Sequence, residues 1–195
     1  LNCGTQHEVR RPFEIFINPP HQMRRYFVEE AAARRPITAH MLTTGTVILN
    51  RDSVVDALIA EAAASLANPP AVDAAAQTYR AYLTVDQLDN ARDLLAAVAP
   101  GSDPHRIDII AVDLMLWRVV DEIIEWRLSA EGGWLPRAKE TLAAWARLDP
   151  AGAALLAEAQ AAPDPAARLA AVAALAQHTF GADSFFEWDS APQLV

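Results

Sequence analysis

Apolar side chains take every second position near the start of the chain. Phe13, Ile15 and Ile17 alternate with other residues, and this period of two predicts a β-strand over residues 12–18. A pair of prolines beginning at Pro19 ends the strand, because proline has no N–H to donate to a neighbouring strand.

After this strand the period becomes helical. Residues 21–35 carry apolar side chains at steps of three and four, with acidic and basic residues between them, which predicts an amphipathic helix. Residues 46–49 are rich in β-branched side chains and predict a second short strand. We therefore expect residues 1–50 to form a partial α/β unit, which is too small to bury a core without support.

The pattern is helical throughout residues 51–195, which we expect to form a separate helical bundle domain. Helices are predicted over residues 53–66, 71–83, 85–98, 104–129, 134–148, 150–161 and 165–180, with prolines, glycines and cap residues between them. The longest should be the spine of the bundle and bury a stripe made of Ile107, Ile110, Leu114, Trp117, Val120, Ile124 and Leu128. The predicted fold class is therefore α+β, mostly α, with the remnant of a mixed sheet followed by a bundle.

Composition and charge narrow the classes of function. The chain has 195 residues, is 52% hydrophobic and carries a net charge of −9, so it lacks the basic surface of a general nucleic-acid binder. Cys3 is its only cysteine, which excludes a disulfide framework and fits a reducing cytoplasm. No apolar run reaches the length of a membrane span. We expect a cytoplasmic protein that has no membrane partner and does not depend on nucleic acid.

Glu14 is an acid in the middle of an otherwise apolar strand. From these residues alone, the favoured interpretation is an edge strand with one solvated face. The other interpretation is a carboxylate held on a rigid strand, where its fixed position suits a metal ligand or a base.

Four stretches of the sequence together resemble a known family. They are FEIFINPP at residues 13–20, RRYF at residues 24–27, HMLTTG at residues 40–45 and WLPRAK at residues 134–139. These stretches resemble nucleotidyltransferase-domain proteins of the DNA polymerase β superfamily, whose kin include the aminoglycoside nucleotidyltransferases. Such proteins join a minimal α/β domain to a C-terminal helical bundle, so the resemblance implies that residues 1–50 are a partial nucleotidyltransferase domain.

The resemblance implies transfer of a nucleoside monophosphate from a nucleoside triphosphate to a hydroxyl of a small-molecule acceptor, with Mg²⁺ as the cofactor. In the family, a Gly-Ser turn holds the phosphates, while an Asp-x-Asp pair and a third acid bind the metal. Glu14 matches the third acid and is the predicted metal ligand and catalytic residue. The residues before the strand contain neither a Gly-Ser helix start nor an Asp-x-Asp pair. The site is therefore expected to be incomplete in this sequence.

Further candidates lie in the predicted helices. The resemblance assigns Arg137 and Lys139 to the triphosphate and Trp134 to the same nucleotide-binding site. The alternative is a tryptophan that anchors the start of a helix beside two solvated bases. His40 is a candidate contact to the nucleotide or to Glu14, although a hydrogen-bonded structural histidine is the favoured interpretation. The acids of the long helix could hold a cationic acceptor, but we favour a solvated face for them: Asp113, Asp121, Glu122 and Glu125.

Two classes of function remain. The first is an enzyme that uses a nucleoside triphosphate and a small-molecule acceptor, with another protein or tRNA as the alternative acceptor. The second is a non-catalytic helical interaction module derived from the same fold, as half of a homodimer or of a toxin–antitoxin pair. Nucleotide binding that depends on Mg²⁺ would favour the first class.

Overall fold

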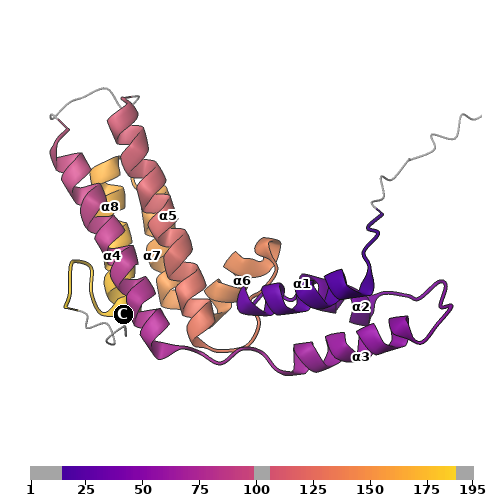
Figure 1. The fold of residues 1–195 in the computed structure, drawn as a ribbon. Helices are drawn as coiled ribbons and strands as arrows, with labels where there is room; N and C mark the ends of the chain where they lie inside the picture. The colour runs from indigo at the N-terminus through magenta and orange to yellow at the C-terminus, as the bar shows by residue number, and fades with distance from the viewer. Residues whose placement is uncertain (1–14, 99–105, 188–195) are drawn as a thin grey trace, which may run out of the picture.

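The computed structural model describes residues 15–98 and 106–187 (Figure 1). This part of the chain contains eight α-helices and no β-strand. The helices are α1 (Pro20–Ala32), α2 (Ile37–Thr44), α3 (Val54–Ala67), α4 (Ala74–Ala96), α5 (Ile107–Ala130), α6 (Ala138–Leu148), α7 (Pro150–Ala161) and α8 (Pro165–Phe180).

The predicted α+β fold is wrong for the described part of the chain, which is all-α and holds no remnant of a nucleotidyltransferase sheet. Residues 15–18 and 46–49, both predicted as strands, are not in a strand, and the side chains of Ile17 and Ile48 are more than nine-tenths exposed. A strand is stable only when a neighbour accepts its hydrogen bonds and one of its faces is buried. Glu14 lies outside the described residues.

Some helix boundaries also differ from the prediction. The two helices predicted on either side of Thr84 are one continuous helix, α4. The Thr84 side chain is buried, and its hydroxyl donates to the backbone oxygen of Arg80 at 2.8 Å. This bond satisfies the Thr84 hydroxyl within the helix, so Thr84 lies inside α4 and does not cap a new helix. The helix predicted to begin at Trp134 begins at Ala138 instead.

The first three helices form a unit of their own, which we call the three-helix unit. Its apolar centre consists of buried Phe27, Ala39, Leu58 and Ala62. On its surface, two guanidinium nitrogens of Arg24 donate to the two carboxylate oxygens of Glu61, each at 2.8 Å. This unit extends to one side of the other helices, at the end where α5 finishes (Figure 1).

Helices α4 to α8 form the bundle, and α5 packs against α4, α6 and α8. The buried face of α5 carries side chains spaced by three and four residues, as amphipathic packing requires: Ile109, Val112, Leu116, Val119, Val120, Ile123 and Ile124. The predicted stripe differs, because Ile107, Ile110 and Leu114 are exposed. Helix α5 is apolar on more than one side, so its periodicity could not identify the buried side.

Asp149 joins three helices of the bundle at one buried carboxylate. It caps α7 by accepting a hydrogen bond from the Gly152 N–H at 2.9 Å, and the His178 imidazole of α8 lies 2.9 and 3.0 Å from its two oxygens. Residue 152 must be glycine, because a Cβ there would lie 2.5 Å from an Asp149 oxygen and 3.0 Å from the Trp145 ring.

The charge of Asp149 is stabilised in the folded state. Burial alone would raise the pKa of its carboxyl, but the Gly152 N–H, the His178 imidazole and the positive charge of Arg127 together outweigh that effect. The pKa of Asp149 therefore lies below its usual value. A carboxylate of this kind stabilises the fold above its usual pKa, and the contribution is lost as the pH falls through the folded-state pKa.

We predict that Asp149→Asn lowers the free energy of unfolding by about 1 to 3 kcal/mol at neutral pH, because the charged acceptor of His178 is lost. The difference from wild type should shrink below about pH 4. Urea unfolding between pH 3 and pH 7 measures both effects. Asp164→Asn is the matched control, since Asp164 caps α8 from an exposed position and asparagine caps equally well. A difference that stays constant with pH would contradict the argument.

Candidate functional site

The three-helix unit and the bundle are joined by the segment between α5 and α6. The Leu135 N–H donates to the backbone oxygen of Arg34 at 2.9 Å, and the Trp134 indole N–H donates to the backbone oxygen of Leu66 at 2.8 Å. Trp134 therefore ties the start of the α6 region to the end of α3. This contact is the one expected of an anchoring tryptophan, and the assignment of Trp134 to nucleotide binding stays a prediction.

Arg34 has a left-handed backbone, with φ at 56°. It follows the end of α1 in a Schellman turn, in which the Arg34 N–H donates to Ala31 and the Arg35 N–H donates to Glu30, both at 2.9 Å. Glycine usually occupies this position, because a side chain there costs about 1 to 2 kcal/mol. An arginine that is kept in this strained backbone conformation indicates that its side chain makes contacts on which the fold depends.

The Arg34 side chain reaches the joining segment. Its Nη2 and Nε donate to the backbone oxygen of Gly133 at 2.8 and 3.2 Å, and its Nη1 donates to that of Ala71 at 3.4 Å. Gly132 and Gly133 both have positive φ values, 75° and 84°, so this turn depends on glycine. One arginine thus links the end of α1 to the segments before α4 and before α6.

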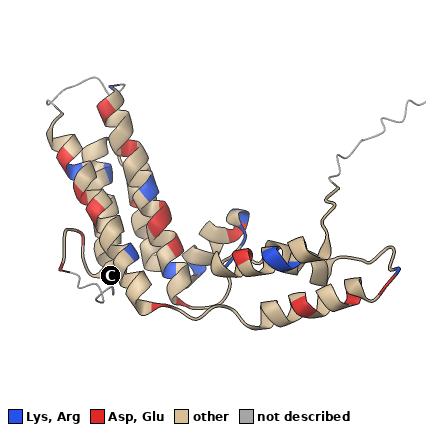
Figure 2. Cartoon of the chain, in the orientation of Figure 1, with Lys and Arg blue, Asp and Glu red and all other residues tan. Residues whose placement is uncertain are grey.

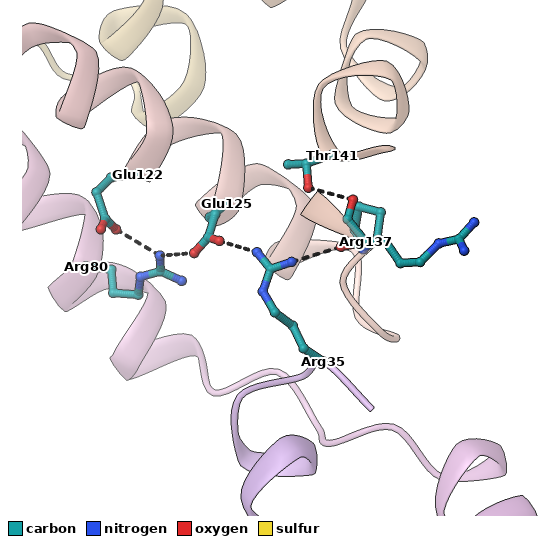
Figure 3. A network of polar contacts seen from close by, with 7 residues as sticks. Arg35, Arg80, Glu122, Glu125, Arg137 and Thr141 are labelled. Atoms are coloured by element: carbon teal, nitrogen blue, oxygen red, sulfur yellow. Dashed lines mark hydrogen bonds and ion pairs between the residues drawn. The ribbon is translucent and has the colours of Figure 1, made fainter. Parts of the chain in front are cut away.

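Arg35 forms a second link beside the first (Figure 3). Its Nη1 donates to the backbone oxygen of Pro136 at 2.9 Å, and its Nη2 pairs with Glu125 of α5. Arg80 of α4 continues the row, at 2.9 Å from Glu122 and 3.7 Å from Glu125. The alternating charges fix the joining segment against α4 and α5.

Arg137 and Lys139 stand at the start of α6, immediately after this fixed segment, and both are exposed. The Arg137 side chain points away from Arg35 and Glu125 (Figure 3), and its Nε lies 3.0 Å from a carboxylate oxygen of Glu140. The hydrogen bond from Arg137 holds the pKa of Glu140 below its usual value, with smaller contributions from Lys139 and Arg147. Arg137 itself caps no backbone N–H of the first turn with its side chain.

His40 is exposed on α2, and its backbone oxygen accepts hydrogen bonds from the hydroxyls of Thr43 and Thr44 at 3.2 and 2.7 Å. It belongs to the three-helix unit, whereas Arg137 and Lys139 belong to the bundle. Its predicted contact to Glu14 involves a residue outside the described part of the chain. The role of His40 in nucleotide binding therefore stays a prediction.

Most of the acids considered for a cationic acceptor are engaged in ion pairs. Asp113 pairs with Arg168, and Glu122 and Glu125 pair with the arginines of the joint. Figure 2 shows acidic and basic positions interspersed along α4 and α5. The favoured interpretation of a charged, partly solvated face agrees with this arrangement.

The described residues contain no cluster of metal-ligating side chains for Mg²⁺. Within residues 15–98 and 106–187, no group of three or more His, Cys, Asp or Glu side chains could hold a metal ion. The predicted ligand Glu14 lies outside these ranges. No step of a reaction can therefore be assigned to a metal from this geometry.

A cleft of about 710 Å³ lies between α5, α6 and α7. Its walls are mostly apolar, with a few polar side chains among them: Trp117, Arg118, Val120, Asp121, Ile124, Ala138, Thr141, Leu142, Trp145, Ala146, Ala153, Leu156, Ala157 and Gln160. The sequence did not identify this cleft. Trp117 and Trp145 were visible only as apolar positions, and the gap between three helices depends on how they pack.

Comparisons with protein-family models, with curated proteins and with solved structures found no match to this chain. Among the helices that the structure describes, none is both long and apolar enough to cross a membrane. In the part of the chain that the structure describes, the exposed cations Arg137 and Lys139 stand at the start of α6. The same helix forms one wall of the apolar cleft.

We predict that Arg34→Gly is more stable than Arg34→Ala by about 1 kcal/mol, because both lose the guanidinium contacts but only glycine relieves the left-handed backbone. Urea unfolding compares the two variants. Hydrogen exchange at the Leu135 amide reports on the joint, and exchange there should be faster in both variants than in wild type. An alanine variant as stable as the glycine variant would show that the Arg34 backbone carries no strain.

Proposed function

We propose that this chain binds a nucleoside triphosphate and takes part in nucleotidyl transfer to a hydroxyl of a small-molecule acceptor. The observation that carries the proposal is the exposed pair Arg137 and Lys139, which follows directly on a segment fixed by Arg34 and Arg35. Transfer reactions depend on holding the phosphates in one position. A cationic pair on a fixed segment supports that role better than one on a free loop.

The side chains suit phosphate groups in different ways. The planar guanidinium of Arg137 can donate two parallel hydrogen bonds to phosphate oxygens, and Lys139 supplies a compact positive charge. The first backbone N–H groups of α6 add partial positive charge at the same end. Glu140 holds the Arg137 guanidinium in the structure described. A triphosphate, which carries more negative charge than one carboxylate, would compete for it.

Glu14 and Mg²⁺ belong to the same proposal through the resemblance described above. Because the described residues do not supply a metal site, the transfer step depends on residues outside them, and we assign no step to the metal. We also propose a cytoplasmic location, because nucleoside triphosphates are available there.

We predict that ATP or GTP binds to this chain and that Lys139→Ala and Arg137→Ala each weaken binding about tenfold or more, since a charged hydrogen bond to phosphate contributes about 1.5 to 3 kcal/mol. Isothermal titration calorimetry with and without Mg²⁺ measures the affinities. Glu14→Gln should remove any dependence on Mg²⁺.

Arg25→Ala is the matched control for Arg137→Ala. Arg25 is also exposed and also pairs with a nearby glutamate of its own helix, Glu29, but it lies on α1. Its replacement should leave nucleotide affinity unchanged. The proposal would be contradicted if Arg137→Ala and Arg25→Ala weakened nucleotide binding equally, or if the wild-type chain bound no nucleotide.

A second candidate function is a non-catalytic interaction module that pairs with another copy of the chain. A groove of about 620 Å³ in the three-helix unit favours it, with lining residues that include Phe16, Met23, Ile37, Met41, Leu42 and Val55. The side chains of Ile37 and Met41 are more than half exposed, and those of the adjoining segment Ile15 to Ile17 are more exposed still. Phe16 of this segment lines the groove of its own chain, so the groove and the segment adjoin in one surface, and two copies could pair these surfaces symmetrically.

We predict for this second candidate that the chain dimerises and that Met41→Asp shifts it to the monomer, because a charge in the groove would be buried without a partner. Light scattering after size-exclusion chromatography measures the mass across a concentration series. Val28→Asp is the control, as Val28 is also an exposed apolar residue, on α1 and outside the groove. A monomer at every concentration excludes this candidate.

A further inference from the structure

We propose that the cleft between α5, α6 and α7 binds the heteroaromatic base of a nucleotide whose phosphates lie at Arg137 and Lys139. This inference rests on the proposed function and adds to it the place of the base. Its evidence is independent of the phosphate argument, because it comes from the size of the cleft, its aromatic wall at Trp117 and its polar side chains.

The cleft has the size and chemistry of a small-molecule site. Its volume of about 710 Å³ lies within the range of roughly 300 to 1,000 Å³ typical of such sites. Val120, Ile124, Leu142 and Leu156 supply apolar walls. Trp145 also lines the cleft and is fully buried.

Trp117 gives the cleft a partly accessible aromatic wall. The Arg168 guanidinium carbon lies 5.8 Å from the centroid of its ring, and Arg168 is itself held by an ion pair with Asp113. The ring is therefore oriented by neighbouring side chains, so a planar ligand would stack on it at a low cost in side-chain entropy.

Polar side chains interrupt the apolar walls of the cleft. Arg118, Asp121, Thr141 and Gln160 line it and together offer both hydrogen-bond donors and acceptors. The edge of a nucleobase also carries both kinds of group, so it can pair with these side chains, which a purely aliphatic ligand cannot do. This set of partners favours a heteroaromatic ring.

The cleft and the cationic pair share the first turns of α6. Lys139, Leu142 and Ala146 are spaced by three and four residues, so they lie on one stripe of the helix. Leu142 and Ala146 line the cleft, and so does Ala138, which lies between Arg137 and Lys139 at the start of the helix. A base in the cleft and a phosphate chain at the start of α6 can therefore belong to one molecule.

Filling the cleft with a side chain tests this inference. Ala157 lines the cleft and is exposed, whereas Ala154 is exposed on the same helix but does not line it. Calorimetry with ATP, GTP, adenosine, guanosine and inorganic tripolyphosphate compares Ala157→Trp with Ala154→Trp. We expect Ala157→Trp to weaken the binding of the preferred nucleotide and nucleoside about tenfold or more, a loss equivalent to about 1.4 kcal/mol, and to leave tripolyphosphate unchanged. Ala154→Trp should change none of them.

The outcomes separate this inference from the proposed function. Nucleotide and nucleoside binding that is the same in both tryptophan variants would overturn the inference, while a loss of tripolyphosphate binding in Lys139→Ala would still support the proposed function. If Ala157→Trp removes nucleoside binding, the inference is supported, whether or not tripolyphosphate binds. Failure of tripolyphosphate to bind would count against the proposed function. Circular dichroism confirms that each variant keeps its helices.

Discussion

The left-handed backbone of Arg34 is the constraint on which the arrangement of the two helical units depends. A Schellman turn ends α1 at this residue, so the next residue, Arg35, leaves the helix in a new direction. Both side chains then reach the segment between α5 and α6 and bind its backbone oxygens. Because each guanidinium presents several donors in a fixed plane, these bonds set the orientation as well as the contact. The start of α6, with its exposed cations, is positioned as a consequence.

The joint and the bundle are stabilised by different interactions. In the bundle, α5 buries one face among α4, α6 and α8, and the buried carboxylate of Asp149 ties α6, α7 and α8 together. The joint consists mainly of hydrogen bonds to backbone oxygens and of the charges that link Arg35, Glu125 and Arg80. One intramolecular hydrogen bond that replaces hydrogen bonds to water contributes only about 1 kcal/mol to the free energy of folding. Burial of one large apolar side chain contributes about 1.5 to 3 kcal/mol. The contacts of the joint thus fix the relative orientation of the two helical units more than they stabilise the fold.

Both proposed functions follow from surfaces that the helices leave uncovered. Helix α6 is too short to cover the whole of α5, which leaves the cleft beside Trp117. The three helices of the N-terminal unit bury only a small centre, which leaves Ile37 and Met41 exposed. The first surface combines an apolar wall with cations and polar groups, and this combination favours a nucleotide. The second carries exposed apolar side chains at Ile37 and Met41 and beside them at Ile15 to Ile17, and favours a protein surface.

The sequence by itself determined most of the helices, because heptad-like spacing, prolines and cap residues are local signals; α7 and α8, for example, begin at Pro150 and Pro165 after capping aspartates. It also singled out the segment from Trp134 to Lys139. Its strand predictions near Ile17, from apolar alternation, and near Ile48, from β-branched residues, were wrong for the described residues, since a strand exists only with a neighbour to pair with. Nor could it identify the buried face of α5, the partners of Arg34 and Arg35, or the cleft. Those depend on contacts between residues far apart in the chain, as with Arg34 and Gly133, and only the tertiary structure brings such residues together.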